Sequence, residues 1–380
     1  MFGAIMPSRI SELINAMGGL DTTGVLLIGK NQFSQLYPVG YTDDLGSYML
    51  IPPLARFINW DVISTAYFIY TAVIILSAIT WLAGVKKLFD LHALSVPKLA
   101  IIFSLILFVI IAIRSDIYVF NAVSISFIPW AYVWINKSRQ IKPLMFLYIL
   151  FIGIVIGGSQ YFRANSGTTF TIFLFVQSFL RLKTKQYKNI LTVWIIFTLG
   201  YIAPKILVQQ LIMERNTFLI SNNISSPDNL LGGHPFWHTA YIGLGYIPNP
   251  YQLKYDDGIA IEKVKSIAPQ ARFCSPLYES ILKEAYFNFI AQYPLYAFKV
   301  YGIKLLLLLL IGVILFLFIG GKMAILNNLV FWPMLAVLCF TLLPPIIAVP
   351  RFNYSSAFLL CILTYGLLQR LLINRSFSQR

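Results

Sequence analysis

The chain has 380 residues, of which 58% are hydrophobic and only 11% charged, and its mean hydropathy is +0.75. Soluble domains carry about 25% charged residues, so this composition excludes a water-soluble fold and predicts one integral membrane domain. The net charge of +15 does not indicate nucleic-acid binding, because the basic residues stand between apolar runs and not in a patch with aromatic side chains. The three cysteines form neither a CxxC pair nor a disulfide framework.

Residues 1–61 form the first predicted unit, a polar segment that contains no membrane-spanning stretch and no signal peptide. The charge pattern described below places this segment outside the membrane. An outside segment without a preceding span is unusual, so we expect a longer version of the chain to carry a first helix. The segment holds two adjacent carboxylates, Asp43 and Asp44, just ahead of an apolar run. They could cap a helix, bind a divalent cation or act as a general base.

Nine apolar stretches follow, and each is a predicted membrane span. They run from Val62 to Gly84, Lys98 to Ile113, Ile117 to Ile135, Leu144 to Gly158, Gly167 to Leu180, Ile190 to Leu207, Tyr301 to Ile319, Ala324 to Val349 and Tyr354 to Leu372. We therefore predict an all-α polytopic membrane protein with one large extracytoplasmic loop. Its units are the N-terminal segment, a six-helix block over 62–207, the loop over 208–300 and three C-terminal helices over 301–380.

Lys and Arg residues predict the orientation of these spans, because cytoplasmic connections carry the excess of positive charge. One alternate set of connections, with the C-terminal tail, holds fourteen Lys and Arg residues, whereas the other set of short connections holds three, Arg114, Arg163 and Arg351. The first set is therefore predicted to be cytoplasmic, together with the C-terminus. The N-terminal segment and the large loop then face outward from a bacterial inner or plasma membrane.

The large loop begins with histidines and aromatic residues. His234, Trp237, His238 and Tyr241 stand close together in the sequence, among Gly and Pro residues. The two histidines are not accompanied by an HExxH glutamate and have Pro235 between them, which argues against zinc. Aromatic rings beside polar groups are typical of a sugar or headgroup site. The alternative is a small core that holds the loop against the membrane.

Asp256 and Asp257 follow in a Lys-Tyr-Asp-Asp-Gly sequence that is typical of a turn, and they are a second candidate pair for substrate binding. From Pro276 to Lys299, apolar positions recur at helical spacing and predict an amphipathic helix on the membrane surface that ends near Pro294.

Three cations stand at the predicted outer face, namely Arg163, Lys205 and Arg351. Cations at an interface can simply extend toward water, but a guanidinium is also a preferred partner of a lipid-linked phosphate. The charge pattern puts these cations, both Asp pairs and both histidines at one face of the membrane.

Together these features resemble the GT-C superfamily of integral membrane glycosyltransferases, in particular the branch with protein mannosyltransferases and lipid A aminoarabinose transferases. The acidic pair Asp43-Asp44 with Tyr48 matches the motif of the first outward loop in that superfamily. The predicted helix from Pro276 to Lys299 resembles its interface helix, and the stretch from Val349 to Phe352 resembles the start of a late helix.

The resemblance implies transfer of a sugar from a polyprenyl-phosphate donor to a lipid, glycan or protein acceptor. Asp43 or Asp44 would act as the general base, and Arg351 would neutralise the departing phosphate. Such a transfer needs no soluble nucleotide, in agreement with the lack of a Gly-rich phosphate loop.

Two other classes remain open at this point. An O-antigen ligase or polymerase would also have many spans and a large outward loop, but would depend on His234, His238 and Arg272 there. A lipid or solute transporter is the non-enzymatic alternative, although transporters tend to carry ionisable residues near the bilayer midplane and internal repeats.

Overall fold

The computed structural model describes residues 5–40, 44–91, 116–137, 143–164, 166–181, 187–230 and 235–319. Over these ranges the chain folds into eleven α-helices and a sheet of two short strands, which confirms the helical class for the described residues. Several predictions fall on residues outside these ranges: Asp43, His234, Arg351 and the spans Lys98–Ile113, Ala324–Val349 and Tyr354–Leu372.

The N-terminal segment forms a small folded unit of two helices and a hairpin. Helix α1 (Pro7–Thr23) has proline at its first position, where no amide hydrogen is needed, and ends at Gly24 with φ 71°. Strands β1 (Ile28–Lys30) and β2 (Leu36–Pro38) pair antiparallel, and α2 (Leu45–Ile58) follows. With 17 and 14 residues, α1 and α2 are not among the described helices that are long and apolar enough to cross a membrane.

Apolar helices make up the middle of the chain. They are α3 (Val62–Leu91), the 3-10 helix η1 (Asp116–Phe120), α5 (Asn121–Lys137), α6 (Pro143–Phe162), α7 (Thr168–Arg181) and α8 (Tyr187–Ser221). Within the described residues three segments are long and apolar enough to cross a membrane, Val62–Lys87, Leu144–Phe162 and Ile190–Ser221. Each contains one of the predicted spans, so these helices indicate a membrane protein.

The helix that contains the sixth predicted span is longer than that span. The span was predicted to end at Leu207, where polar residues begin, and α8 continues to Ser221. The loop assigned to 208–300 therefore starts with fourteen residues of helix. A helix satisfies its own backbone hydrogen bonds and so does not have to end where the apolar sequence ends.

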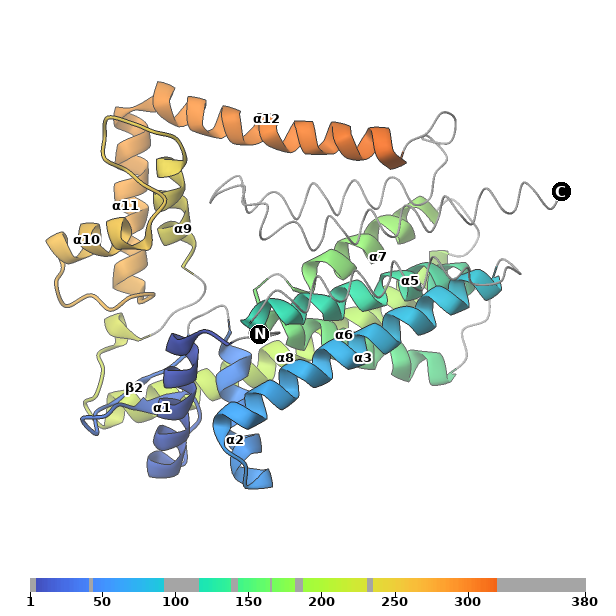
Figure 1. The fold of residues 1–380 in the computed structure, drawn as a ribbon, viewed down its shortest axis with the longest axis horizontal. Coiled ribbons are helices and arrows are strands. Elements are labelled where there is room, and N and C mark those ends of the chain that lie inside the picture. The colour runs from blue at the N-terminus through green and yellow to red at the C-terminus, as the bar shows by residue number, and fades with distance from the viewer. Residues whose placement is uncertain are drawn as a thin grey trace.

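The rest of the described chain forms a second polar unit and one more apolar helix. Its elements are η3 (Pro227–Asn229), α9 (Phe236–Gly243), η4 (Leu244–Tyr246), α10 (Asp257–Ile267), α11 (Pro276–Gln292) and α12 (Pro294–Ile319). The predicted amphipathic helix is α11, which begins at Pro276 and stops at Gln292, and Pro294 starts α12. Figure 1 shows α9, α10 and α11 at the same end of the long helices as α1 and α2.

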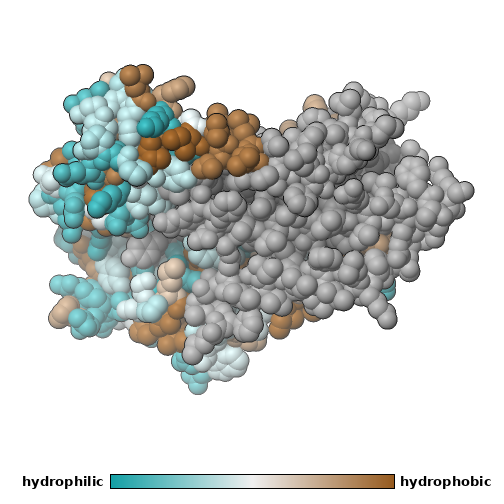
Figure 2. All heavy atoms as spheres, turned by 45° about the horizontal axis from the view of Figure 1, so that its top comes forward, coloured by the Kyte–Doolittle hydropathy of each residue, from teal (hydrophilic) through white to brown (hydrophobic). Residues whose placement is uncertain are grey.

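Two buried clusters define these units. Side chains of α1, α2, α3, η1 and α8 share one core, and side chains of α9, α10 and α11 share another. In Figure 2, hydrophilic residues gather at the end of the molecule that carries α9 to α11, and hydrophobic residues lie beside them on the molecular surface. This arrangement of a polar end and apolar helices is what a membrane protein with one large polar region requires.

Candidate functional site

A cavity of about 710 Å³ lies between the two polar units and the adjoining ends of the apolar helices. It is lined by charged side chains of both signs, Arg9, Glu12, Asp44, Arg163, Asp257 and Arg272. Four residues predicted for a site, Asp44, Arg163, His238 and Asp257, meet in this one space although they are far apart in the sequence. The volume falls in the range of roughly 300–1,000 Å³ that is usual for small-molecule sites.

Arg9 of α1 joins two buried carboxylates at the inner wall of this cavity. Its guanidinium pairs with Asp44, and its Nε donates to Asp116 Oδ1 at 2.8 Å. Both carboxylates are fully buried. Burial lowers the pKa of Arg9, but Asp116 and two tyrosines outweigh this effect and raise it above its ordinary value. The ion pairs fasten the N-terminal helix to the start of α2 and to η1.

Asp44 occupies the N-cap position of α2, but its side chain makes no capping hydrogen bond. Helix capping, one of the roles considered for this carboxylate, is therefore not what Asp44 does in the structure, because its charge is directed to Arg9. Within the described residues no group of three His, Cys, Asp or Glu side chains could hold a metal ion. A cation at Asp43 and Asp44 stays a prediction, since Asp43 lies outside these residues.

Glu12 is the third acid on this wall, one helical turn after Arg9. Its carboxylate accepts hydrogen bonds from the Tyr48 hydroxyl at 3.1 Å and from the Gly40 amide at 3.3 Å. Burial raises the pKa of Glu12 although both hydrogen bonds oppose the shift. Burial also raises the pKa of Tyr48, which keeps its proton and remains a donor to Glu12.

Arg163 directly follows α6 and lines the cavity. Its guanidinium carbon lies 4.8 Å from the centre of the Tyr118 ring, a cation–π contact that holds the charge at the ends of the apolar helices. Lys205, the other cation predicted to bind phosphate, is exposed on α8 and does not line the cavity.

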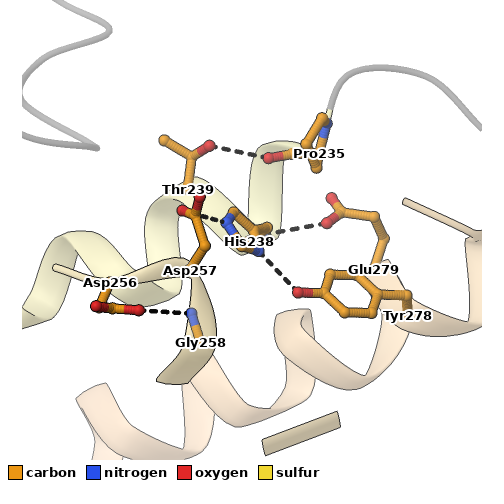
Figure 3. A network of polar contacts seen from close by, with 8 residues as sticks. All are labelled: Pro235, His238, Thr239, Asp256, Asp257, Gly258, Tyr278 and Glu279. Atoms are coloured by element: carbon orange, nitrogen blue, oxygen red, sulfur yellow. Dashed lines mark hydrogen bonds and ion pairs between the residues drawn. The ribbon is translucent and has the colours of Figure 1, made fainter. Parts of the chain in front are cut away.

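His238 contributes from the opposite wall, within the network shown in Figure 3. Its ring is buried, with Nδ1 2.8 Å from the Tyr278 hydroxyl and Nε2 3.1 Å from Asp257 Oδ1. Burial raises the pKa of Tyr278, as do the nearby Cys274, Glu279 and Asp257, so Tyr278 stays protonated. A histidine held between a carboxylate and a hydroxyl can accept or donate a proton at the cavity wall.

Glu279 of α11 holds the backbone of His238 in place. Its carboxylate accepts from the backbone amides of Trp237 at 2.8 Å and His238 at 3.1 Å, in the first turn of α9. Carboxylates stabilise helix N-termini through such bonds, so α11 sets the position of α9 and thereby of the His238 ring.

Trp237 and Tyr241, predicted as parts of a substrate platform, do not line the cavity. The Trp237 ring packs against Tyr286 and Phe287 of α11, with ring centres 5.6 and 5.2 Å apart, and Tyr241 is buried in the same core. Both thus hold α9 against α11, so this stretch forms a small core, and its position against a membrane stays a prediction. Asp256 is exposed and caps α10 by accepting from the Gly258 amide at 2.7 Å.

Several residues of the site were not predicted from the sequence, and only one of them had a recognisable sequence signal. Arg9 and Glu12 belong to a polar segment without any motif, whereas Asp116 stands between two predicted spans, 107 positions from Arg9. Tyr37 lies in a strand that hydropathy did not predict. Only Asp116 had a usable signal, because a carboxylate at the start of an apolar span is costly to bury and is seldom there without a partner.

Comparisons of this chain with protein-family models, with curated proteins and with solved structures found no match.

Proposed function

We propose that this chain is an integral membrane glycosyltransferase of the GT-C kind, with about nine spans and an extracytoplasmic active site. It moves a sugar from a polyprenyl-phosphate donor to a lipid, glycan or protein acceptor. One observation carries the proposal: a single cavity at the ends of the apolar helices joins Asp44, Arg163 and Asp257. A donor that arrives through the bilayer needs a cation at the membrane edge and a base beside it.

In the proposed reaction, the acceptor hydroxyl loses its proton to Asp43 or Asp44, and its oxygen forms the new bond to the anomeric carbon. The bond from that carbon to the phosphate oxygen breaks, and the polyprenyl phosphate leaves with both electrons. Arg163 and Arg351 stabilise the phosphate charge. These roles need only groups at the outer ends of the helices.

The decisive test compares Asp44→Asn with Asp116→Asn in membranes supplied with a panel of polyprenyl-phosphate sugars labelled in the sugar. Each variant removes one carboxylate from Arg9, so both lose a similar amount of stability, but only Asp44 lines the cavity. We expect Asp44→Asn to lower transfer by about 100-fold or more, the usual effect of losing a general base. Asp116→Asn should lose much less.

Full transfer in Asp44→Asn and in a variant that also carries Asp43→Asn would refute the base assignment. No labelled product with any donor of the panel would refute the function itself. Flux of lipid or solute across vesicles without a covalent product would instead support a transporter.

A ligase-like or polymerase-like enzyme is the second candidate, and the His238 network favours it. The ring of His238 lines the same cavity and is oriented by Asp257 and Tyr278. In that enzyme the histidine of the loop carries the chemistry. His238→Gln should then abolish transfer of a lipid-linked glycan, and Asp44→Asn should leave it nearly unchanged.

A further inference from the structure

One charge in the cavity is left without a counter-charge among the described residues. Arg9 pairs with Asp44 and Asp116, and Asp257 lies beside His238. The guanidinium of Arg272, on the segment between α10 and α11, has no hydrogen bond or ion pair with any described residue. It is only partly exposed, so this cation has lost part of its hydration without gaining an anion.

Neighbouring residues fix the position of Arg272 on the cavity wall. Its backbone amide donates to Asn229 Oδ1 at 3.1 Å, which fixes the segment, and its guanidinium carbon lies 6.0 Å from the centre of the Tyr37 ring. Burial lowers the pKa of Arg272, and only Tyr37 opposes this shift. An arginine with a free planar fork, partly buried on a cavity wall, has the geometry that binds carboxylate or phosphate oxygens.

Tyr37 adds a hydrogen-bond donor beside this cation. Its hydroxyl oxygen accepts from Asn15 Nδ2 at 2.9 Å, and burial raises the pKa of Tyr37, so its own proton remains available. Gly29 lies opposite Tyr37 in the hairpin, and a Cβ there would be 2.9 Å from the tyrosine Cζ. The missing side chain of Gly29 therefore leaves the space that the Tyr37 ring fills.

We propose that Arg272 and Tyr37 form a binding site for an anionic group, a carboxylate or a phosphate, carried by the acceptor. Arg163 directly follows the membrane-length helix α6, whereas Arg272 belongs to the polar unit on the other wall of the cavity. The phosphate of a lipid donor lies at the membrane surface, so the Arg272 site serves the second molecule. The term acceptor rests on the proposed function, but the anion site itself does not.

The first experiment measures ligand binding and needs no transfer. Purified protein in nanodiscs is titrated with glucose, glucuronate and glucose 1-phosphate, which share one ring and differ in the anionic group. We expect one or both anionic sugars to bind more tightly than glucose. Arg272→Gln should weaken that binding by about tenfold or more and leave glucose unchanged.

The matched control is Lys265→Gln, which removes an equal charge from an exposed position on α10 outside the cavity. It should bind all three sugars like the wild type. Tyr37→Phe should weaken the anionic sugars severalfold. Equal affinity of the wild type for the three sugars, or an unchanged affinity for the anionic sugars in Arg272→Gln, would overturn the site.

A second measurement separates the acceptor from the donor. Binding of undecaprenyl phosphate to the same nanodiscs should be weakened by Arg163→Gln and retained by Arg272→Gln. The reverse pattern would assign the Arg272 anion to the donor lipid and overturn the proposal. Anion binding at Arg272 together with a failed transfer assay would count against the proposed function alone.

Discussion

Arg9 shows how much of the site depends on single side chains brought together by the fold. It forms ion pairs with two buried carboxylates that belong to the start of α2 and to η1. Removing one partner from a buried ion pair commonly costs about 3–5 kcal/mol, because the remaining charge is left buried without compensation. The same ion pairs therefore build this wall of the cavity and attach the N-terminal unit to α2 and η1.

Glu12 gives a prediction about pH. Burial raises its pKa, so above the unfolded value of about 4.3 the native protein holds this proton while the unfolded chain has released it. The contribution of Glu12 to the free energy of unfolding then falls as the pH rises, until the folded pKa is passed. We expect the wild-type Tm minus the Glu12→Gln Tm to fall between about pH 4 and pH 7.

Thermal denaturation in detergent across this pH range is the measurement, with the exposed Glu262→Gln as its control. That control should give a nearly constant difference from the wild type. A Glu12→Gln difference that is constant or rises with pH would contradict the burial argument.

Tyr278 gives a second prediction at this scale. In Tyr278→Phe the buried His238 loses the hydroxyl at 2.8 Å from its Nδ1. We expect a loss of about 1 kcal/mol in the free energy of unfolding. Under the ligase-like mechanism a larger fall in transfer should accompany it, because the ring is no longer oriented. Chemical denaturation and transfer assays on one preparation measure both, and an unchanged stability would mean that water replaces the hydroxyl.

The fold brings several of the residues named from the sequence together. Asp44, Arg163, His238 and Asp257 line one cavity, and each was named as a polar residue of a segment predicted to lie at one face of the membrane. Arg272 was named only in the ligase alternative. No feature of the sequence distinguished Arg9 and Glu12, because the residues that they contact are distant along the chain and come near only in the folded protein.

Helices α6 and α8 form the most extensive helix contact of the described chain, and glycines bring their backbones close together. Gly153 and Gly157 are one turn apart on α6, in a GxxxG pattern, and face α8 where Gly200 lies. A Cβ on Gly157 would be 2.3 Å from the Tyr201 carbonyl oxygen, and one on Gly153 would be 2.4 Å from that of Phe197. Small residues allow such backbone contact between membrane helices.

This contact predicts opposite results for two neighbouring glycines. Gly157→Ala should force α6 and α8 apart and cost about 1–3 kcal/mol, whereas Gly158→Ala meets only Pro204 at 4.0 Å and should be tolerated. Thermal stability in one detergent measures both. Because Arg163 follows α6, transfer should fall with Gly157→Ala as well. Equal stability of the two variants would show that the helices are less tightly packed than described.

Elements were predicted better than residues, but unevenly. A long apolar run in lipid must satisfy its own backbone hydrogen bonds, which favours a helix. Helices accordingly cover six of the predicted spans, namely Val62–Gly84, Ile117–Ile135, Leu144–Gly158, Gly167–Leu180, Ile190–Leu207 and Tyr301–Ile319. The GxxxG pattern was readable but overlooked. The end of α8 was not readable, since Glu214 and Arg215 continue the helix beyond the apolar run. The hairpin strands of three residues are too short to show a pattern.

At the scale of the molecule, the cavity restricts the topology. It is lined by the N-terminal unit and by the unit from α9 to α11, which predicts that both lie on one side of the membrane. The distribution of Lys and Arg predicts that this side is the outer one. These two arguments are independent, because one uses charges in the connections and the other uses packing.

Labelling with a membrane-impermeant maleimide tests this topology in intact cells, in a background with the three cysteines replaced by serine. Phe33→Cys, at a position 73% exposed in the hairpin, and Lys265→Cys should react from outside. Lys87→Cys, exposed near the far end of α3, should react only after the cells are opened. Labelling of Phe33→Cys and Lys265→Cys from opposite sides would contradict the shared cavity.

The uninterrupted length of α8 has a mechanical consequence. Its 35 residues span roughly 52 Å, well beyond a hydrocarbon core of about 30 Å, and Pro204 within it removes one backbone hydrogen bond and permits a bend there. The part after Pro204 packs through Val208 into the core that holds Arg9 and Asp44 in place, and the part before it packs against α6. In a membrane, a thinner or thicker bilayer changes the tilt of such a long helix. Lipid chain length should therefore change the geometry of this cavity through α8, without direct contact between the lipid and the residues that line the cavity.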